Sequence, residues 1–548
     1  MFDSIQFAII IAICSVITSY GVYLWFQGGC ERIIGKAILA CILGFIIANT
    51  LAVSLYVAWE GIQITPYPWY SYILIEHLPH NTLAYQHFII TLMASYVVVS
   101  GLLPVLFFSK YFTKDTTFGD AHFASPFEIK KAGLYDDDGI ILGKAYGKTL
   151  KLPGFESVLV TAPTGSGKTT SIAIPNLLAW EGSGIFNDLK GELYEKTAKH
   201  REAVLDNKCF QWAPANSDKN THRYNPFFYV STNPDLRIRD LQLIAEIIIP
   251  AERVDGGFWY TSSREIFIML AIYLFETKGM ATLSEVHDLS KQKNFIDWLS
   301  VSVKEKEIQD YIFYQNAYSL LNSDEKTQKN IIKDFHSRMV LFNDPIVRHA
   351  TSGNDFDLRL IKKEKISVYV CIPDSDKERL KTILTLFWAQ AINLMTQKIP
   401  DISQEPYAVL ALLDEFGNMA RINKLKDGLS FFRGYRLRAV IIVQYLSQIT
   451  SVYGVYDTKG FLNCKVKIAF ALNDVDDAQF FSKSLGTKTV KVRSQGISRG
   501  RHYSSSQNIG LQGKPLMSSD EIMKLDKQAE ILLIESAYPI LAFKVLKD

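Results

Sequence analysis

Residues 155–180 read FESVLVTAPTGSGKTTSIAIPNLLAW, and this stretch decides the fold of the chain. It begins with a short apolar run typical of a buried strand, continues through a glycine-rich turn, and ends in a helix-forming segment. The turn 162–169, APTGSGKT, has the pattern of a P-loop except at Ala162, where glycine is usual. The alternative, a glycine-rich turn that binds nothing, is disfavoured by the strand–loop–helix context.

Each residue type in this turn suits the binding of a nucleoside triphosphate. Gly165 and Gly167 lack a Cβ atom, so backbone N–H groups can approach phosphate oxygens, and the following helix adds the positive end of its dipole. Lys168 is the expected contact of the β- and γ-phosphates, and the Thr169 hydroxyl is an expected ligand of Mg²⁺. The predicted nucleotide-binding residues are Thr164, Gly165, Ser166, Gly167, Lys168, Thr169 and Thr170.

A P-loop ATPase also requires a second, acidic motif, and a candidate follows about 245 residues after the glycine-rich turn. Residues 408–415 read AVLALLDE, an apolar strand that closes on two acids and has the pattern of a Walker B motif. Asp414 would hold Mg²⁺ through water, and Glu415 would polarise the attacking water. The next buried strand, 440–443, ends at Gln444. This residue either senses the γ-phosphate and orients water, or only caps the following turn.

The order of strand and helix patterns predicts an α/β nucleotide-binding domain interrupted by an all-α insertion. Strand-like runs stop near Pro234, helical periodicity continues to about Ala350, and the run ISVYVCI at 366–372 restores the α/β pattern. The segment DLKGEL at 188–193 follows a predicted strand, where it either faces a ligand or forms a solvated turn. The predicted domains are a membrane anchor at 1–110, the Walker A part at 111–230, the all-α insertion at 231–350 and the Walker B part at 351–548.

The N-terminal region contains three long uncharged runs, at 5–26, 37–59 and 88–109. Each is long enough to cross a hydrocarbon core of about 30 Å as a helix. Arg32 and Lys36 lie in the first connection, whereas the second connection, 60–87, has no lysine or arginine. The positive-inside rule then predicts that 27–36 and everything after 110 are cytoplasmic, and that the N-terminus and 60–87 are outside. The chain is therefore expected to be a multi-pass membrane protein.

Charge and cysteine usage exclude some classes and leave one local basic segment. The formal net charge is only +3, so no global basic bias indicates nucleic acid, and the six cysteines have no metal-ligand spacing. Residues 478–519 contain no Asp or Glu but carry seven lysines and arginines. This segment either follows a phosphate backbone or is a flexible solvated hairpin.

Three arginines lie between the Walker B motif and the strand that ends at Gln444. They occur within FFRGYRLR at 431–438, as Arg433, Arg436 and Arg438. They form either a solvated face or the source of an arginine finger for the γ-phosphate of a neighbouring subunit. The sequence does not decide between Arg433 and Arg436 for that role.

Five motifs in order, TAPTGSGKTT, DLKGEL, LLDEFGNMARI, IIVQYLSQI and KPLMSSDEI, resemble the TraG/TraD type of type IV secretion coupling proteins. The resemblance covers roughly residues 115–548, with Leu189 where proline is usual and Gly417-Asn418 where the family often has Pro-Ala. It implies a RecA-like, hexameric, membrane-anchored ATPase that uses ATP and Mg²⁺. By the same resemblance, Glu415 and Gln444 are catalytic, Asp414 and Thr169 hold the metal, and Arg433 is the expected finger.

The resemblance also implies partners. Such proteins recruit a relaxase–DNA complex or protein effectors and feed them to a type IV secretion channel, with DNA contacted without sequence specificity. Two alternatives remain open. One is a DNA pump of the FtsK type, although no long linker or winged-helix tail is visible, and the other is an ATP-gated receptor that docks substrates without moving them. An ABC transporter is excluded because no LSGGQ-like signature precedes Asp414. The cargo, plasmid DNA or effectors, is not predicted.

Overall fold

The computed structural model of the chain describes residues 31–61, 70–79, 82–112, 116–251, 257–306, 308–419, 421–499 and 503–545. The chain divides into two compact units, residues 1–120 and residues 121–548. The first unit contains three described helices, α2 (Glu31–Glu60), α3 (Tyr70–His77) and α4 (Leu83–Phe112). They pack through Tyr56 against Phe88, and the Ser71 hydroxyl donates to Asn49 Oδ1 at 2.7 Å.

The membrane anchor predicted from the sequence is not confirmed. Among the residues that the structure describes, no single helix is both long and apolar enough to cross a bilayer, although the bent pair 257–278 and 283–290 passes by length and composition. The predicted span 5–26 lies outside the described residues. The other two, 37–59 and 88–109, fall within α2 and α4.

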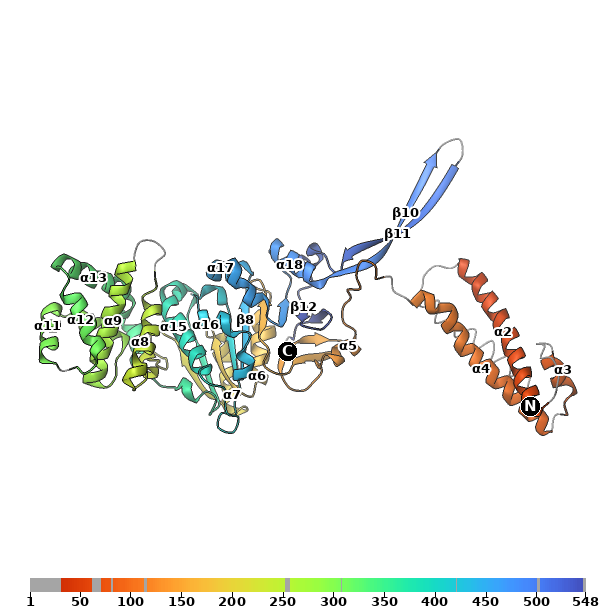
Figure 1. Ribbon diagram of the computed structural model, residues 1–548, viewed down its shortest axis with the longest axis horizontal. Helices are drawn as coiled ribbons and strands as arrows, with labels where there is room; N and C mark the ends of the chain where they lie inside the picture. Colours follow the sequence, from red (N-terminus) through yellow and green to blue (C-terminus); the bar gives the residue numbers. More distant parts are fainter. Residues whose placement is uncertain are drawn as a thin grey trace. The chain divides into compact units, whose positions relative to one another are not determined.

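The second unit is built on a mixed sheet that runs through its centre (Figure 1). In the described residues its strand order is β2-β1-β13-β12-β9-β3-β8-β7-β4-β6-β5. The strands from β9 to β5 are parallel, whereas β12, β13, β1 and β2 pair antiparallel at one end. Their bounds are β1 (Ile140–Ala145), β2 (Lys148–Leu152), β3 (Val158–Thr161), β4 (Ser183–Asn187), β5 (Lys208–Trp212), β6 (Ile366–Val370), β7 (Val409–Leu413), β8 (Leu437–Val443), β9 (Val466–Ala469), β12 (Ala529–Ile534) and β13 (Ile540–Phe543).

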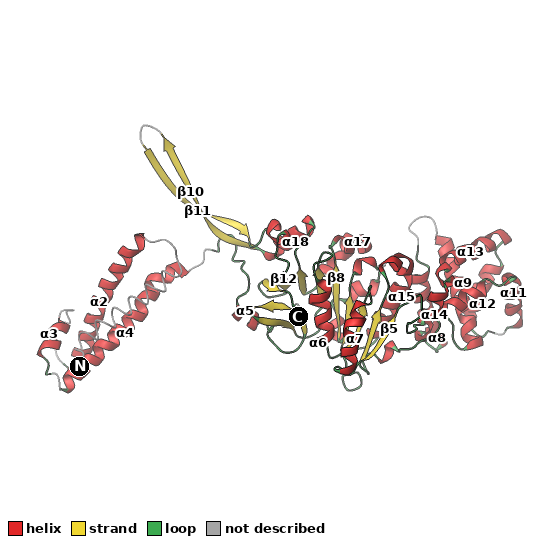
Figure 2. Ribbon diagram, turned by 180° about the vertical axis from the view of Figure 1, so that it is seen from behind, coloured by secondary structure: helices red, strands yellow, loops and turns green. Residues whose placement is uncertain are grey.

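The central strands are apolar on both faces because helices cover both sides of the parallel sheet. In β7, Val409, Ala411 and Leu413 face one core, whereas Leu410 and Leu412 face the other. The second face is covered by η1 (Thr169–Ala173), α6 (Ile174–Ala179) and α7 (Glu192–Ala203), with α6 and α7 in front in Figure 2. The first face is covered by η2 (Pro226–Tyr229), α15 (Lys377–Met395), α16 (Asn423–Gly428) and α17 (Ser447–Leu462).

Helices alone fill the region between β5 and β6, and they gather at one end of the second unit (Figure 1). The first α-helix of this region begins at Pro234 and the last ends at Ala350, which are the points where the sequence pattern changes. Thr282 caps α10 as its S/T-x-x-E pattern predicts, since its hydroxyl accepts from Glu285 N. The helices are α8 (Pro234–Ile248), α9 (Gly257–Lys278), α10 (Leu283–Ser290), α11 (Phe295–Glu305), α12 (Tyr311–Leu321), α13 (Glu325–Arg338), η3 (Val340–Asn343) and α14 (Pro345–Ala350).

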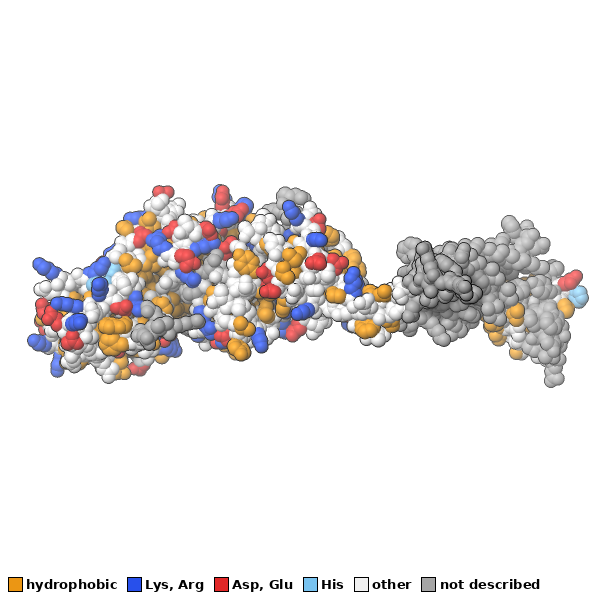
Figure 3. All heavy atoms as spheres, turned by 90° about the horizontal axis from the view of Figure 1, so that it is seen from above, with side chains coloured by type: hydrophobic (Ala, Val, Ile, Leu, Met, Phe, Trp, Pro, Cys, Tyr) orange, Lys and Arg blue, Asp and Glu red, His pale blue; other side chains and the backbone are white. Residues whose placement is uncertain are grey.

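A separate two-stranded hairpin, β10 (Thr487–Arg499) and β11 (Tyr503–Pro515), extends away from the sheet (Figure 1). It contains most of the basic segment predicted from the sequence, although residues 478–485 belong to the preceding helix, α18 (Val475–Leu485). On the face of the second unit seen in Figure 3, cationic and anionic side chains are interspersed. The remaining described elements are α5 (Pro126–Lys131), η4 (Leu358–Leu360), η5 (Asp374–Asp376), η6 (Phe416–Asn418), η7 (Phe432–Tyr435) and α19 (Ser519–Met523).

Candidate nucleotide-binding site

The glycine-rich turn lies at the carboxyl end of β3 and leads directly into η1 and α6. Gly165 and Gly167 have φ angles of 75° and 85°, in the left-handed region that favours glycine. A Cβ atom at Gly165 would meet nothing within 4 Å, so the turn faces open space at that point. The Ser166 hydroxyl donates to the Pro163 carbonyl at 2.6 Å, which fixes the turn from within. Ala162, the departure from the pattern, is fully buried and fits where glycine is usual.

Lys168 brings the two predicted motifs together. Its Nζ lies 3.3 Å from Asp414 Oδ1 and 3.3 Å from Glu415 Oε1, although Glu415 is 247 residues away in the sequence. The two strands that carry them, β3 and β7, are separated in the sheet by β8. Because all three strands are parallel, their carboxyl ends share one edge, and both motifs lie there.

The two acids experience different environments. Burial raises the pKa of Asp414, although the nearby Lys168 ammonium opposes this effect. For Glu415, burial would also raise the pKa, but the hydrogen bond from Lys377 and the charge of Lys168 outweigh it and lower the pKa. Glu415 has a φ of 53°, which is unusual for a residue with a side chain and is typical of functional sites.

The segment after β4 has a structural role in this site. The Asp188 carboxylate is buried and accepts from Tyr194 N at 2.8 Å, so it caps the first turn of α7. Burial raises its pKa, and backbone donors at the start of α7 oppose the rise. The side-chain amide of the neighbouring Asn187 donates to the backbone carbonyl of Asp414 at 2.6 Å. The buried Asp188 is therefore not part of a solvated turn: its carboxylate caps α7, and Asn187 beside it supports the Walker B strand.

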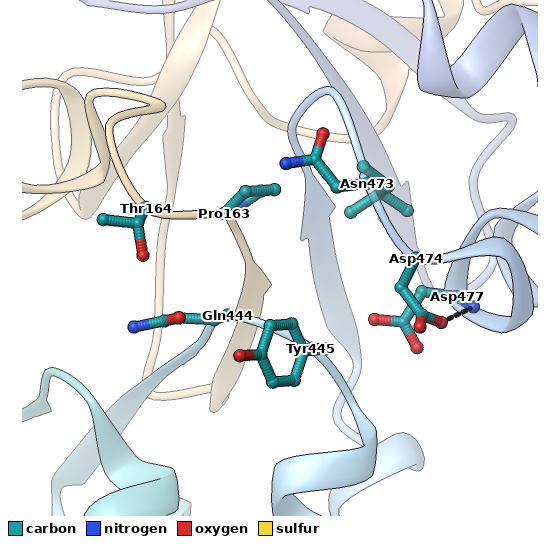
Figure 4. A pocket seen from close by; sticks show the side chains of 8 residues that line it. Pro163, Thr164, Gln444, Tyr445, Asn473, Asp474 and Asp477 are labelled. Carbon is teal, nitrogen blue, oxygen red and sulfur yellow. Dashed lines mark hydrogen bonds between the residues drawn. The ribbon is translucent and has the colours of Figure 1, made fainter.

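Gln444 lies at the carboxyl end of β8, between the other two motifs. It lines a pocket with Pro163 and Thr164, which come from the glycine-rich turn, and with Tyr445 (Figure 4). Its backbone N–H donates to Gln448 Oε1 at 2.9 Å. The same pocket is lined by Leu472, Asn473, Asp474 and Asp477, from the loop after β9 and the start of α18.

The three arginines of 431–438 lie away from this edge. Arg433 precedes β8, and its Nη1 lies 2.9 Å from Glu156 Oε1, which precedes β3, so it lies at the opposite end of these parallel strands from Lys168. Arg436 donates to the Glu405 carbonyl at 3.3 Å. Arg438 lies inside β8, is fully buried, and donates to the carbonyls of residues 152 and 153. Arg438 is therefore neither solvated nor available as a finger. Strand β8 begins at Leu437, before the apolar run that marks it in the sequence, so it includes Arg438.

Two lysines that sequence reasoning did not single out also contact this site. Lys377, the first residue of α15, lies with its Nζ 3.0 Å from Glu415 Oε2. Lys544, just past β13, donates to the Ser166 carbonyl of the turn at 2.8 Å. The position of Lys377 after strand β6 was a usable signal, because charged residues there point to the functional edge. No pattern in the sequence indicates Lys544.

Comparisons with known proteins show which proteins this chain resembles. The model of the family described as "Type IV secretory system Conjugative DNA transfer" matches residues 122–547. The chain is 29% identical to the protein VirD4 of Rhizobium radiobacter over 443 residues, which is 78% of this chain and 63% of that protein. It is 27% identical to the conjugal transfer protein TraG of Escherichia coli, over 69% of this chain and 63% of that protein. The chain therefore matches less than two thirds of the length of these relatives.

Solved structures show the same fold at low sequence identity. The plasmid coupling protein TrwB in complex with ADP and Mg²⁺ superposes with a TM-score of 0.57 at 15% identity, covering 78% of this chain and 94% of that chain. The unbound form of TrwB lacking its N-terminal 70 residues gives a TM-score of 0.57 at 16% identity, over 79% and 96% of the two chains. The predicted RecA-like α/β fold is thereby confirmed for the second unit.

Proposed function

The chain belongs to the type IV secretory system conjugative DNA transfer family, and from this premise we propose that it is an ATPase that drives substrates into a type IV secretion channel. The observation that carries the proposal is the meeting of Lys168 with Asp414 and Glu415 at one sheet edge, at 3.3 Å each. A lysine at the end of a glycine-rich turn that faces two acids from another strand of the same sheet is typical of a site that binds and cleaves a nucleoside triphosphate.

We assign the roles residue by residue. The turn and the start of η1 bind the phosphates, Lys168 contacts the β- and γ-phosphates, and Glu415 polarises the attacking water. Gln444 orients that water from the end of β8. The full set of proposed phosphate contacts is Thr164, Gly165, Ser166, Gly167, Lys168, Thr169 and Thr170.

The donor set at this edge also fits Mg²⁺. A hydroxyl at Thr169 and a carboxylate at Asp414 are the oxygen ligands that this ion prefers, and it keeps several waters of its own. When bound, Mg²⁺ neutralises developing negative charge on the phosphates. Lys168 also balances the charge of Asp414, as the ion pair at 3.3 Å indicates.

The assembly and the location of the chain follow from the same family. We propose a homo-hexamer, in which Arg433 of one subunit faces the nucleotide of its neighbour. Arg433 lies at the sheet edge opposite the glycine-rich turn of its own subunit, and its side chain is 66% exposed. Both features support a role between subunits. We further propose that the first unit anchors the chain in the bacterial inner membrane, with the second unit in the cytoplasm. The partners are secretion channel components and a relaxase–DNA complex or effector proteins.

The test measures ATP hydrolysis and substrate transfer by the full chain and two variants. Lys168→Ala should lose hydrolysis, whereas Glu415→Gln should bind ATP but not turn it over, because a neutral amide is a poor base. A complete absence of Lys168-dependent hydrolysis, even with DNA present, would contradict the proposal. Substrate transfer that survives Glu415→Gln would indicate a receptor that docks cargo and does not move it.

A further inference from the structure

The Glu415 carboxylate is held between two cations that come from different parts of the second unit. Its Oε1 lies 3.3 Å from Lys168 Nζ, and its Oε2 lies 3.0 Å from Lys377 Nζ. The two oxygens thus have separate partners, which fixes the plane of the carboxylate as well as its position. The backbone of Glu415 is in the left-handed region, a conformation that persists where the surroundings hold it.

We propose that Lys377 is a positioning residue for Glu415, and that the first turn of α15 ties this carboxylate to the helical insertion. The inference rests on the proposed function, in which Glu415 acts on the attacking water. When ATP is bound, Lys168 is expected to contact the phosphates. Lys377 then remains as the cation that orients Glu415, leaving Oε1 directed toward the nucleotide.

Lys377 is itself largely buried and has a second acidic partner. Its ammonium also pairs with Asp374, three residues earlier in η5, and its side chain is only 14% exposed. It is the first residue of α15, whose buried face packs into the core beneath the sheet. Because Lys377 has two acidic partners and begins a buried helix, it restricts the Glu415 carboxylate more than a mobile surface lysine would.

The same turn of α15 is anchored on the insertion. Arg379, two residues after Lys377, donates to Asp376 Oδ1 at 2.7 and 2.9 Å and also pairs with Asp344. Asp344 caps α14, because its Oδ1 accepts from Ile346 N at 2.8 Å. Arg379 thus joins α14 to the turn that carries Lys377.

The contact continues into the insertion beyond α14. Arg348, on α14, donates to both carboxylate oxygens of Asp288 at 2.9 and 2.6 Å, and Asp288 lies on α10. Ion pairs thus connect α10 and α14 with the turn beside Glu415. A series of ion pairs thus connects the helical insertion with the proposed base.

The first experiment separates positioning from a general structural role. In the full chain in detergent, we expect Lys377→Met to lower kcat for ATP hydrolysis about 100-fold, the scale on which general-base catalysis and its alignment contribute. KM and the affinity for a fluorescent ATP analogue should stay within about twofold, and Lys377→Arg should restore part of kcat. The matched control is Lys381→Met on the same helix, where the lysine lies 3.9 Å from Glu378 and should leave kcat unchanged.

The second experiment tests the anchor with a double-mutant cycle. Arg379→Met and Asp344→Asn should each lower kcat several-fold, with asparagine retaining the cap of α14. The double variant should lose no more than Arg379→Met alone, because that variant already removes the pair with Asp344 together with the bonds to Asp376. If the effects of Arg379→Met and Asp344→Asn on kcat multiply in the double variant, the anchor between α15 and α14 is overturned. A kcat of Lys377→Met equal to that of wild type overturns the positioning role. A wild-type chain without Lys168-dependent hydrolysis instead contradicts the proposed function itself.

Discussion

Glu530, a buried acid at the edge of the sheet, leads to a prediction whose size follows from its surroundings. It lies in β12, is fully buried, and neither carboxyl oxygen has a hydrogen-bond partner among the described residues. Burial raises its pKa from 4.5 to about 8, and the charge of Lys544 only partly opposes the rise. The folded chain therefore keeps this side chain protonated at neutral pH, whereas the unfolded chain ionises it.

The sign follows from linkage between protonation and folding. A carboxyl group whose pKa is raised in the folded state contributes its full stability below pH 4.5 and loses it as the pH rises to about 8. At about 1.4 kcal/mol per pH unit, the loss is on the order of 1 kcal/mol at pH 5 and about 4 kcal/mol at pH 7.5. Glu530→Gln removes this titration, so its stability relative to wild type should rise by about 3 kcal/mol between these pH values.

The assay is thermal unfolding of the full chain in detergent without nucleotide, followed by tryptophan fluorescence at pH 5 and pH 7.5. For a unit of this size, about 3 kcal/mol corresponds to a midpoint shift on the order of 3–6 °C. Any cost of burying the amide is the same at both pH values and cancels. Glu535→Gln is the matched control, because Glu535 follows the same strand with a 59% exposed side chain. Midpoints of Glu530→Gln and wild type that move in parallel with pH would refute the reasoning.

Three further predictions concern other parts of the second unit. Gly143→Ala should lower the unfolding midpoint, because the added Cβ would lie 2.0 Å from Glu530 Oε1, and the Glu530→Ala background should relieve the loss. His287 is fully buried, and burial lowers its pKa from 6.5 to about 4. Wild type should therefore lose stability as the pH falls from 6.5 to about 4, and His287→Leu should flatten this dependence in the same unfolding assay. If the hairpin β10–β11 binds DNA, its affinity should fall steeply as the salt concentration rises. Charge reversal at Lys488, Lys491 or Arg493 should then reduce the salt slope in a binding titration by about one per residue. Unchanged DNA binding by these variants would discard this role.

Much of the fold could be predicted because its signals are local. A glycine-rich turn between a strand and a helix, and an apolar strand closing on Asp414 and Glu415, are continuous stretches whose residue types reflect their own chemistry. The start of the helical insertion at Pro234 was equally visible, because the apolar period changes there from strand to helix. Arg438 was misjudged for a related reason: a charged residue ended the apolar run, although β8 buries it against two backbone carbonyls.

By itself, the sequence determined the class of fold and the family, and it predicted which residues bind phosphate and metal, since these depend on side-chain types at fixed short spacings. Only the tertiary structure decided which of them meet. It brought Lys168 to the Walker B acids, placed Arg433 at the far edge, and added Lys377 and Lys544 to the site. The physical reason is that strand order in a parallel sheet is set by packing between distant segments, and no local pattern records which strand ends share an edge.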